Sequence, residues 1–250
     1  MRFSKWQALG NAYLVVEDEA LTAERARELC DPERGIGADG VLEIVAVDGA
    51  RASVAVWNPD GSVAELSGNG ARIAARWLAE RSGADEVTLT FGKREVTGRM
   101  LAGDDVRLEL GAVEVAETER LTVDGQLVEV TPVSVGNPHA VVRGEPDRDA
   151  LLALGPALEH HERFPGRTNV QLVRVDGPGE LTVLVWERGA GETAASGSSA
   201  VAAAAAAVAN RWVESPVRVR MPGGELLVEL DEENRATLTG PVTYVYSGEL

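Results

Sequence analysis

The sequence predicts an α+β fold of two pseudo-symmetric lobes, each a bent, mainly antiparallel sheet wrapped around a central helix. The main observation is a single long internal repeat. Trp57 and Trp186 each end an alternating apolar run, and each leads to a Ser-Gly pair, at Ser67 and Ser196. An Ala-rich stretch of helical character follows both pairs. The motifs Gly10-Asn11 and Gly136-Asn137 also recur within apolar runs, so one supersecondary unit is used twice.

In the first half, apolar alternation predicts strands and helical spacing predicts helices. The expected helices are 21–29, led by Thr22, and 71–81. The expected strands are 1–17, interrupted at Gly10-Asn11, then 41–47, 52–57, 87–91, 94–99 and 106–110.

The second half repeats this order. Its expected helices are 147–154 and 200–212, and its expected strands are 128–135, 139–143, 169–175, 180–186, 216–220, 225–230 and 235–239. We expect an N-terminal lobe over 1–115 and a C-terminal lobe over 116–240, with the last strand, 241–250, crossing back to join the N-terminal lobe.

Composition excludes several classes of function. The 250 residues are 44% hydrophobic and carry a net charge of −16, which argues against nucleic acid or an anionic membrane as a partner. One cysteine, Cys30, and three histidines make a disulfide framework or a metal site improbable, so none is expected. The N-terminus lacks the apolar segment of a signal peptide, and a cytoplasmic location is therefore expected.

The two Ser-Gly turns are the first candidate site. Ser67-Gly68-Asn69-Gly70 and Ser196-Gly197-Ser198-Ser199 each stand at the start of a predicted helix. Unpaired backbone N–H groups and the helix dipole make such a start an anion-binding position. The structural alternative is that both serines are ordinary N-caps. Because the turn occurs twice in a duplicated unit, we favour a paired site that holds a carboxylate.

Other polar residues interrupt apolar strands. Asn11, Asn58, Asn137 and Asn169 are either turn formers or buried amides that need partners, which a substrate could supply. Glu187-Arg188 directly follows a core strand, where an arginine suits carboxylate binding or a structural ion pair. His139 is either a base or a structural hydrogen-bonding group.

These motifs together resemble the diaminopimelate epimerase family, and the resemblance runs almost end to end. The stretches that carry it are Gly10-Asn11, Arg34–Gly40, Asn58–Ser62, Ser67–Arg72, Gly136–His139, Phe164-Pro165, Thr168–Val170 and Glu187–Thr193. The resemblance implies two mirror-related lobes with a substrate cleft between them. It also implies inversion of an amino-acid α-carbon without pyridoxal phosphate, metal or other cofactor, in lysine and cell-wall precursor biosynthesis, by a homodimer.

The resemblance also implies roles for particular residues. Ser67 and Ser196 take the places of the two acid-base residues. Backbone groups of Gly68-Asn69 and Gly197-Ser198 would hold the reacting carboxylate, with His139 close by. The distal amino-acid end of the substrate would be held by Asn11, Asn58, Asn169, Glu187 and Arg188.

One departure from the family affects the chemistry directly. The family's two acid-base residues are cysteines, whereas this chain has Ser67 and Ser196. A thiol with a pKa near 8.5 becomes a usable base at a helix N-terminus, but an alcohol is a far weaker acid. A neighbouring group such as His139 or Glu192 would have to assist. Cys30 lies far from these motifs in the sequence and is not expected to substitute.

The sequence therefore predicts a cofactor-independent isomerase of the diaminopimelate epimerase type acting on a small amino acid. Two alternatives stay open. The cleft could serve a related dehydratase or double-bond isomerase, or the chain could be a catalytically silent form that only binds an amino acid.

Overall fold

The structure, a computed structural model, describes residues 1–250 and divides into two compact units. The N-terminal unit comprises Met1–Glu109 and Thr239–Leu250, and the C-terminal unit comprises Leu110–Leu238. The sequence analysis placed the boundaries between the lobes at 115/116 and 240/241. Those boundaries remain a prediction.

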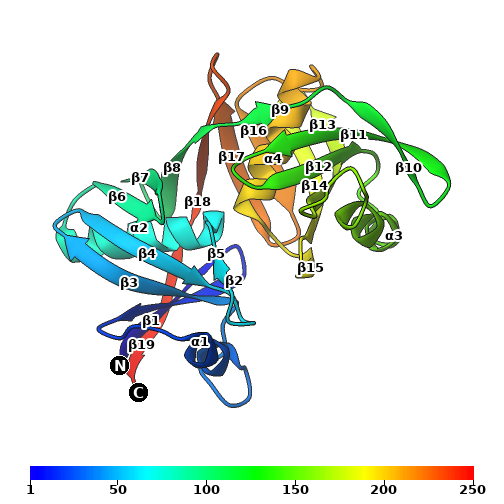
Figure 1. The fold of residues 1–250 in the computed structure, drawn as a ribbon. Coiled ribbons are helices and arrows are strands. Elements are labelled where there is room, and N and C mark those ends of the chain that lie inside the picture. Colours follow the sequence, from blue (N-terminus) through cyan, green and yellow to red (C-terminus); the bar gives the residue numbers. More distant parts are fainter. The chain divides into compact units, whose positions relative to one another are not determined.

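The N-terminal unit contains a largely antiparallel sheet, coloured blue to green in Figure 1. Its strand pairs are antiparallel except for β2 with β3 and β4 with β6, which are parallel. The helices are α1 (Ala23–Cys30) and α2 (Gly68–Ser82). The strands are β1 (Arg2–Ala8), β2 (Asn11–Glu17), β3 (Gly40–Asp48), β4 (Arg51–Trp57), β5 (Val63–Ala64), β6 (Glu86–Phe91), β7 (Arg94–Met100) and β8 (Asp105–Ala112), which reaches the next unit.

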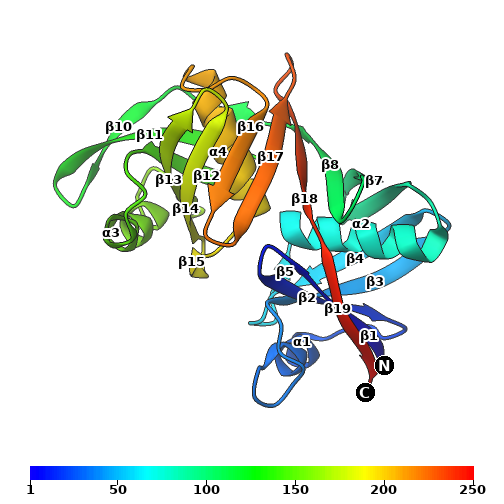
Figure 2. The same ribbon diagram turned by 180° about the vertical axis from the view of Figure 1, so that it is seen from behind.

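The last strand returns to the N-terminal unit. Strand β19 (Thr243–Glu249) pairs antiparallel with β1, so that Arg2 lies opposite Glu249. The two chain ends therefore lie together, as Figure 2 shows. The Met1 amino group donates a hydrogen bond to the Leu250 carbonyl oxygen at 2.8 Å.

The C-terminal unit repeats the connectivity of the first. The parallel pair β12–β13 corresponds to β2–β3, and the parallel pair β14–β16 corresponds to β4–β6. Its helices are α3 (Arg148–Glu159) and α4 (Gly197–Ala209). Its strands are β9 (Glu114–Val115), β10 (Glu119–Val123), β11 (Gln126–Ser134), β12 (Pro138–Arg143), β13 (Asn169–Gly177), β14 (Glu180–Glu187), β15 (Gly191–Thr193), β16 (Val217–Met221), β17 (Gly224–Leu230) and β18 (Arg235–Pro241).

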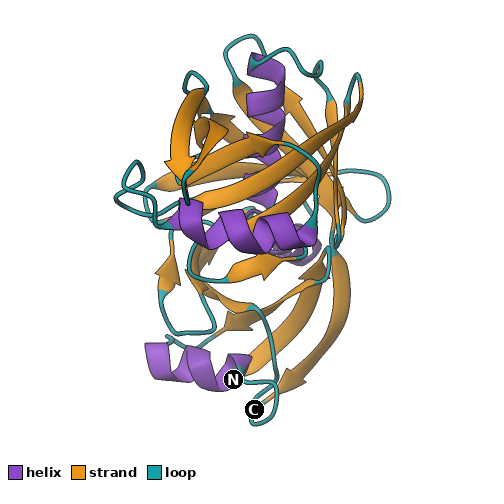
Figure 3. Ribbon diagram, turned by 90° about the vertical axis from the view of Figure 1, so that its right-hand side faces the viewer, coloured by secondary structure: helices purple, strands orange, loops and turns teal.

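Each unit encloses one buried helix, and most of the regular secondary structure in both units is strand (Figure 3). Helix α2 contacts β1, β6 and β7, and α4 contacts β11, β12, β13 and β17. Every residue from Ser199 to Ala207 is buried, which explains why α4 consists mostly of alanine: small side chains let surrounding strands approach closely. The predicted α+β class with two pseudo-symmetric lobes is confirmed. No helix is long and apolar enough to cross a membrane.

The structure departs from the sequence prediction at several helix ends, most clearly at three of them. Helices α2 and α4 begin at Gly68 and Gly197 rather than at Ala71 and Ala200, because the preceding serines are the N-caps. Helix α3 continues past Pro156 to Glu159. Tertiary contacts outweigh the proline there, since Leu158 is fully buried and the Glu159 carboxylate accepts a hydrogen bond from Trp186 Nε1 at 2.7 Å.

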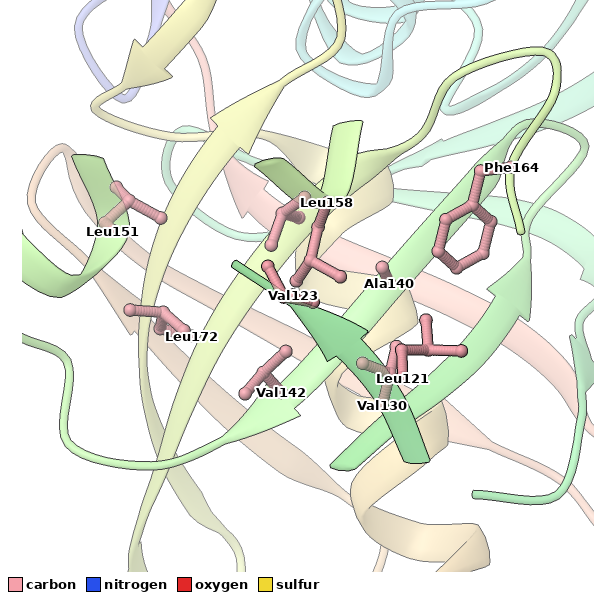
Figure 4. Packing of buried hydrophobic residues seen from close by; sticks show 10 residues of the cluster. Leu121, Val123, Val130, Ala140, Val142, Leu151, Leu158, Phe164 and Leu172 are labelled. Carbon is pink, nitrogen blue, oxygen red and sulfur yellow. The ribbon is translucent and has the colours of Figure 1, made fainter. Parts of the chain in front are cut away.

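Helix α3 covers one face of the C-terminal sheet through an apolar cluster. Leu151 and Leu158 of α3 pack with Val142 and Leu172 of the adjacent strands, as Figure 4 shows. Close packing continues at Gly155, where an added Cβ atom would lie 2.6 Å from Trp186 Cγ. Gly155 is therefore required by the approach of α3 to Trp186.

This approach predicts the effect of Gly155→Ala. Alanine favours the helix, but the clash with the indole ring forces α3 outward, and we expect a net loss of about 1–3 kcal/mol in the free energy of unfolding. Urea denaturation measures the change. Gly144→Ala is the control, because an added Cβ at Gly144 meets nothing within 4 Å. Equal stability of the Gly155→Ala variant and the native chain would contradict this account of the packing.

Candidate functional site

Ser67 is the N-cap of α2 and makes two hydrogen bonds through its hydroxyl. Its backbone is extended, with φ −122° and ψ 124°, which turns the chain into the helix. The Ser67 Oγ atom accepts a hydrogen bond from the Gly70 backbone N–H at 3.0 Å. It lies 2.9 Å from the hydroxyl oxygen of Tyr13, on strand β2. Ser67 is thus both the cap expected from the sequence and the partner of a phenol.

A buried arginine supports the first turn of α2. Arg72 is fully buried, and burial lowers the pKa of its guanidinium to about 10, so it remains charged at neutral pH. It donates to Asn69 Oδ1 at 2.7 Å and to the Gly68 carbonyl oxygen at 3.4 Å. Asn69 in turn donates to Asn11 Oδ1 at 3.4 Å. Asn11 and the Ser67 turn therefore belong to one polar cluster.

Gly70 leaves the start of α2 close to the sheet. A Cβ atom there would lie 3.0 Å from Leu42 Cδ2 and 3.2 Å from Ser67 Cβ.

Asn58 is held by hydrogen bonds within its own turn. Its backbone N–H donates to the Ser62 carbonyl oxygen at 2.8 Å, and its side-chain amide donates to Ser62 Oγ at 2.9 Å. The side chain of Asn58 therefore closes its own turn, as a turn-forming residue does.

Ser196 is the N-cap of α4 and differs from Ser67 in its hydrogen bonds. Its backbone is again extended, with φ −142° and ψ 123°, but its side chain makes no capping hydrogen bond. Ser196 is buried and Glu187 is partly buried. Burial raises the pKa of the Glu187 carboxyl, while the nearby hydroxyls of Thr193 and Ser196 oppose that rise. The Thr193 hydroxyl oxygen itself is buried without a hydrogen-bond partner.

A buried polar network lies beside the Ser196 turn. Gln171 Nε2 lies 3.0 Å from His139 Nδ1 and donates to Ser199 Oγ at 3.0 Å. The other ring nitrogen of His139 lies 3.0 Å from Asn137 Oδ1. Burial and, secondarily, the charge of Arg188 lower the pKa of His139 to about 3. His139 is therefore neutral at physiological pH, and Gln171 and Asn137 engage both of its nitrogens.

Asn169 connects this network to the Glu187-Arg188 segment. It lies opposite His139 in the parallel β12–β13 pair. Its side-chain amide donates to the Pro138 carbonyl oxygen at 3.0 Å and accepts from the Arg188 backbone N–H at 3.0 Å. The Arg188 guanidinium donates to the Gly166 carbonyl oxygen at 3.2 Å at an exposed position. Asn169 thus orients the backbone from which the Arg188 side chain extends.

Two other groups considered from the sequence are engaged elsewhere. Glu192 is exposed and forms an ion pair with Arg148 at 2.8 Å, so its carboxylate is bound by a guanidinium. Cys30 is the last residue of α1 and lies in a buried apolar cluster, and burial raises the pKa of its thiol to about 11. It therefore does not replace the missing thiols. No group of three or more His, Cys, Asp or Glu side chains is arranged to hold a metal ion.

Sequence reasoning missed the roles of three polar residues at these turns. They are Tyr13, Arg72 and Gln171, each of which is hydrogen-bonded to a residue that the sequence analysis singled out. The sequence contained a signal for two of them. Tyr13 occupies the position of His139, and Gln171 is a polar residue within the otherwise apolar run of β13.

The low pKa of His139 predicts acid sensitivity. In the unfolded chain a histidine ordinarily titrates near pH 6.5, whereas in the native chain the pKa of His139 is about 3. As pH falls from about 6.5 to 3, the unfolded state binds a proton that the native state does not. This one group therefore lowers the free energy of unfolding by about 1.4 kcal/mol per pH unit at most.

Urea unfolding across this pH range measures the slope. His139→Gln should reduce the slope of the unfolding free energy against pH by the contribution of up to one bound proton. His160→Gln, which removes an exposed histidine, is the control. NMR titration of the His139 ring in the native chain gives a second reading that needs no variant. A His139 ring that becomes protonated near pH 6.5 would contradict the assignment.

Comparisons with known proteins identify the family of the chain. The family model of diaminopimelate epimerase matches residues 3–114 and 131–245. The chain is 37% identical over 280 residues to the diaminopimelate epimerase of Desulfitobacterium hafniense, covering 100% of this chain and 98% of that protein. It is 36% identical over 274 residues to the diaminopimelate epimerase of a Synechocystis species, with the same coverages.

Solved structures share the fold. A predicted epimerase from Pseudomonas aeruginosa superposes with a TM-score of 0.77 at 20% identity, covering 100% of this chain and 98% of that one. The repeated Ser-Gly turns, the duplicated connectivity and the full-length sequence match lead to one assignment. The chain belongs to the diaminopimelate epimerase family.

Proposed function

We propose that the chain is a cofactor-independent amino-acid epimerase that interconverts LL- and meso-diaminopimelate in lysine biosynthesis. One group removes the α-proton and a second returns a proton to the opposite face. The observation that carries the proposal is the pair of serine N-caps: Ser67 and Ser196 each begin the buried central helix of one unit. Membership of the family over nearly the whole chain supports the same activity.

The helix starts suit the electronic demand of this reaction. Removal of an α-proton places negative charge on the carbanion and its carboxylate, and preorganised donors stabilise that charge. In this proposal backbone groups of Gly68 and Asn69, and of Gly197 and Ser198, hold the reacting carboxylate. The charged Arg72 beneath the first turn of α2 fixes Asn69 and the Gly68 carbonyl group, so the turn needs little rearrangement when the substrate binds.

The other candidate residues would recognise the distal amino-acid group of the substrate. Arg188 would bind its carboxylate, and Glu187 would bind its amino group. Asn11, Asn58 and Asn169 would complete the recognition by hydrogen bonds. The neutral, doubly engaged His139 is better suited to donating or accepting a hydrogen bond than to removing a proton, because its pKa is about 3.

A cytoplasmic location and a homodimer belong to the same proposal, and the homodimer rests on the family resemblance. A second candidate function is favoured by one observation. Serine stands at both acid-base positions, and this favours a silent protein that binds the amino acid without inverting it.

Arg188→Ala tests the recognition of the distal carboxylate. Loss of a charge-assisted hydrogen bond of about 1.5–3 kcal/mol should weaken binding of LL-diaminopimelate at least about tenfold by calorimetry. The control is Arg235→Ala, which removes an exposed arginine paired with Glu233. Unchanged affinity of the Arg188→Ala variant would remove Arg188 from the binding site.

The Ser67→Cys/Ser196→Cys double variant tests the reaction. A thiolate forms far more readily than an alkoxide at a helix N-terminus, so we expect the epimerisation rate to rise at least about a hundredfold. Chiral chromatography of the product from LL-diaminopimelate measures that rate for both proteins. If the double variant binds LL-diaminopimelate but does not epimerise it, the binding-only candidate is favoured and the proposed epimerase activity fails.

A further inference from the structure

The hydroxyl of Ser67 has an ionisable neighbour. Tyr13 Oη lies 2.9 Å from Ser67 Oγ, and the phenol belongs to a buried residue on strand β2. The pKa of a phenol is ordinarily about 10, whereas a serine alcohol does not ionise appreciably in water. Of the two oxygens in this pair, the phenolic oxygen is the one that can change its protonation state.

The ring of Tyr13 is held in place by its neighbours. Tyr13 lies opposite Gly40 in the parallel β2–β3 pair. A Cβ atom at Gly40 would lie 2.5 Å from Tyr13 Cε1, so only glycine leaves room for the ring there. The repeat places His139 at the equivalent position of the C-terminal unit, opposite Asn169. His139 contacts Gln171 and Asn137, whereas Tyr13 contacts the serine N-cap itself.

The hydrogen-bonding capacity of Ser67 matches a role in proton transfer. A hydroxyl has one proton to donate and two acceptor positions. The Gly70 N–H occupies one acceptor position at 3.0 Å. When neutral Tyr13 donates to the second position, the Ser67 proton is left free for a substrate atom. When Ser67 donates to ionised Tyr13, its second acceptor position is left free instead.

We infer that Tyr13 is the proton-relay partner of Ser67, so that the two residues act as one acid-base pair in the epimerase. This inference rests on the proposed function. Tyr13 acts through Ser67 and is therefore a positioning residue that also stores the proton.

The proton balance is simple in both directions. As a base, Ser67 Oγ takes the substrate α-proton while its own proton moves to the Tyr13 phenolate, leaving neutral Tyr13, neutral Ser67 and the substrate carbanion. As an acid, Ser67 gives its proton to the carbanion and receives the proton of neutral Tyr13, which becomes the phenolate. No step requires a serine alkoxide to persist, because the phenolic oxygen carries the negative charge before the base step and after the acid step.

Tyr13→Phe tests the inference because it keeps the ring and removes only the hydroxyl. General acid-base assistance is ordinarily worth about 10²–10⁴-fold, so we expect kcat/KM for epimerisation of LL-diaminopimelate to fall at least about a hundredfold. The fall should lie in kcat rather than in KM, and the titration of the phenol should disappear from the pH profile. Tyr244→Phe is the matched control, because the exposed Tyr244 hydroxyl donates to Ser247 Oγ at 3.0 Å and not to Ser67.

A second background separates a relay from a merely structural hydrogen bond. In the Ser67→Cys chain the thiol ionises by itself, so adding Tyr13→Phe should cost at least tenfold less than it costs the native chain. An equal loss in both backgrounds, or a native-like rate and pH profile for Tyr13→Phe alone, would overturn the inference. If the native chain binds LL-diaminopimelate but epimerises none of it, the proposed function fails and the relay with it. A native chain that is active and indifferent to Tyr13→Phe overturns the relay alone.

Discussion

The capping of two buried helices is the constraint on which the rest of the molecule depends. A helix start leaves backbone N–H groups without intrahelical partners, and α2 and α4 begin inside their units, where Gly68 and Gly197 are buried. Polar groups gather at both helix starts. In the N-terminal unit Ser67 Oγ accepts from the Gly70 N–H, and Arg72, Asn69 and Asn11 form a hydrogen-bonded cluster in the same turn. In the C-terminal unit Gln171, Ser199 and His139 form the corresponding polar cluster. The same unsatisfied donors that the fold must accommodate are suited to holding a carboxylate.

The two turns have the same backbone form but different surroundings. Ser67 accepts a hydrogen bond from Gly70 and faces a phenol, whereas Ser196 makes no capping bond and lies near Glu187, a carboxyl whose pKa burial raises. Gly70 packs against Leu42, while the matching Ser199 accepts a hydrogen bond from Gln171. Duplication thus preserved the connectivity, and the polar partners diverged. A pair of unlike acid-base groups suits an enzyme that must remove a proton on one face and return it on the other.

The internal repeat made the architecture predictable, because paired Trp and Ser-Gly positions recur with the same strand order. Local patterns were less reliable where tertiary contacts decide. Helix α3 passes through Pro156 because Leu158 and Glu159 are held by the sheet, and no sequence period indicates this. Among the candidate residues, the Ser-Gly turns were found from the repeat alone. Tyr13 and Arg72 were missed because an apolar strand and an amphipathic helix explain a tyrosine and an arginine equally well. The structure distinguishes them: Tyr13 lies 2.9 Å from Ser67, and Arg72 is completely buried.

Inversion of an amino-acid α-carbon by a chain with serine at both N-caps can be tested on the native protein. The most direct test incubates the native chain with LL-diaminopimelate in D2O and follows α-deuterium incorporation by NMR, together with the configuration of the product. We expect deuterium to enter at the α-carbon as meso-diaminopimelate forms. Saturable binding without any deuterium incorporation would contradict it, because a working acid-base pair at either turn must exchange the α-proton with solvent.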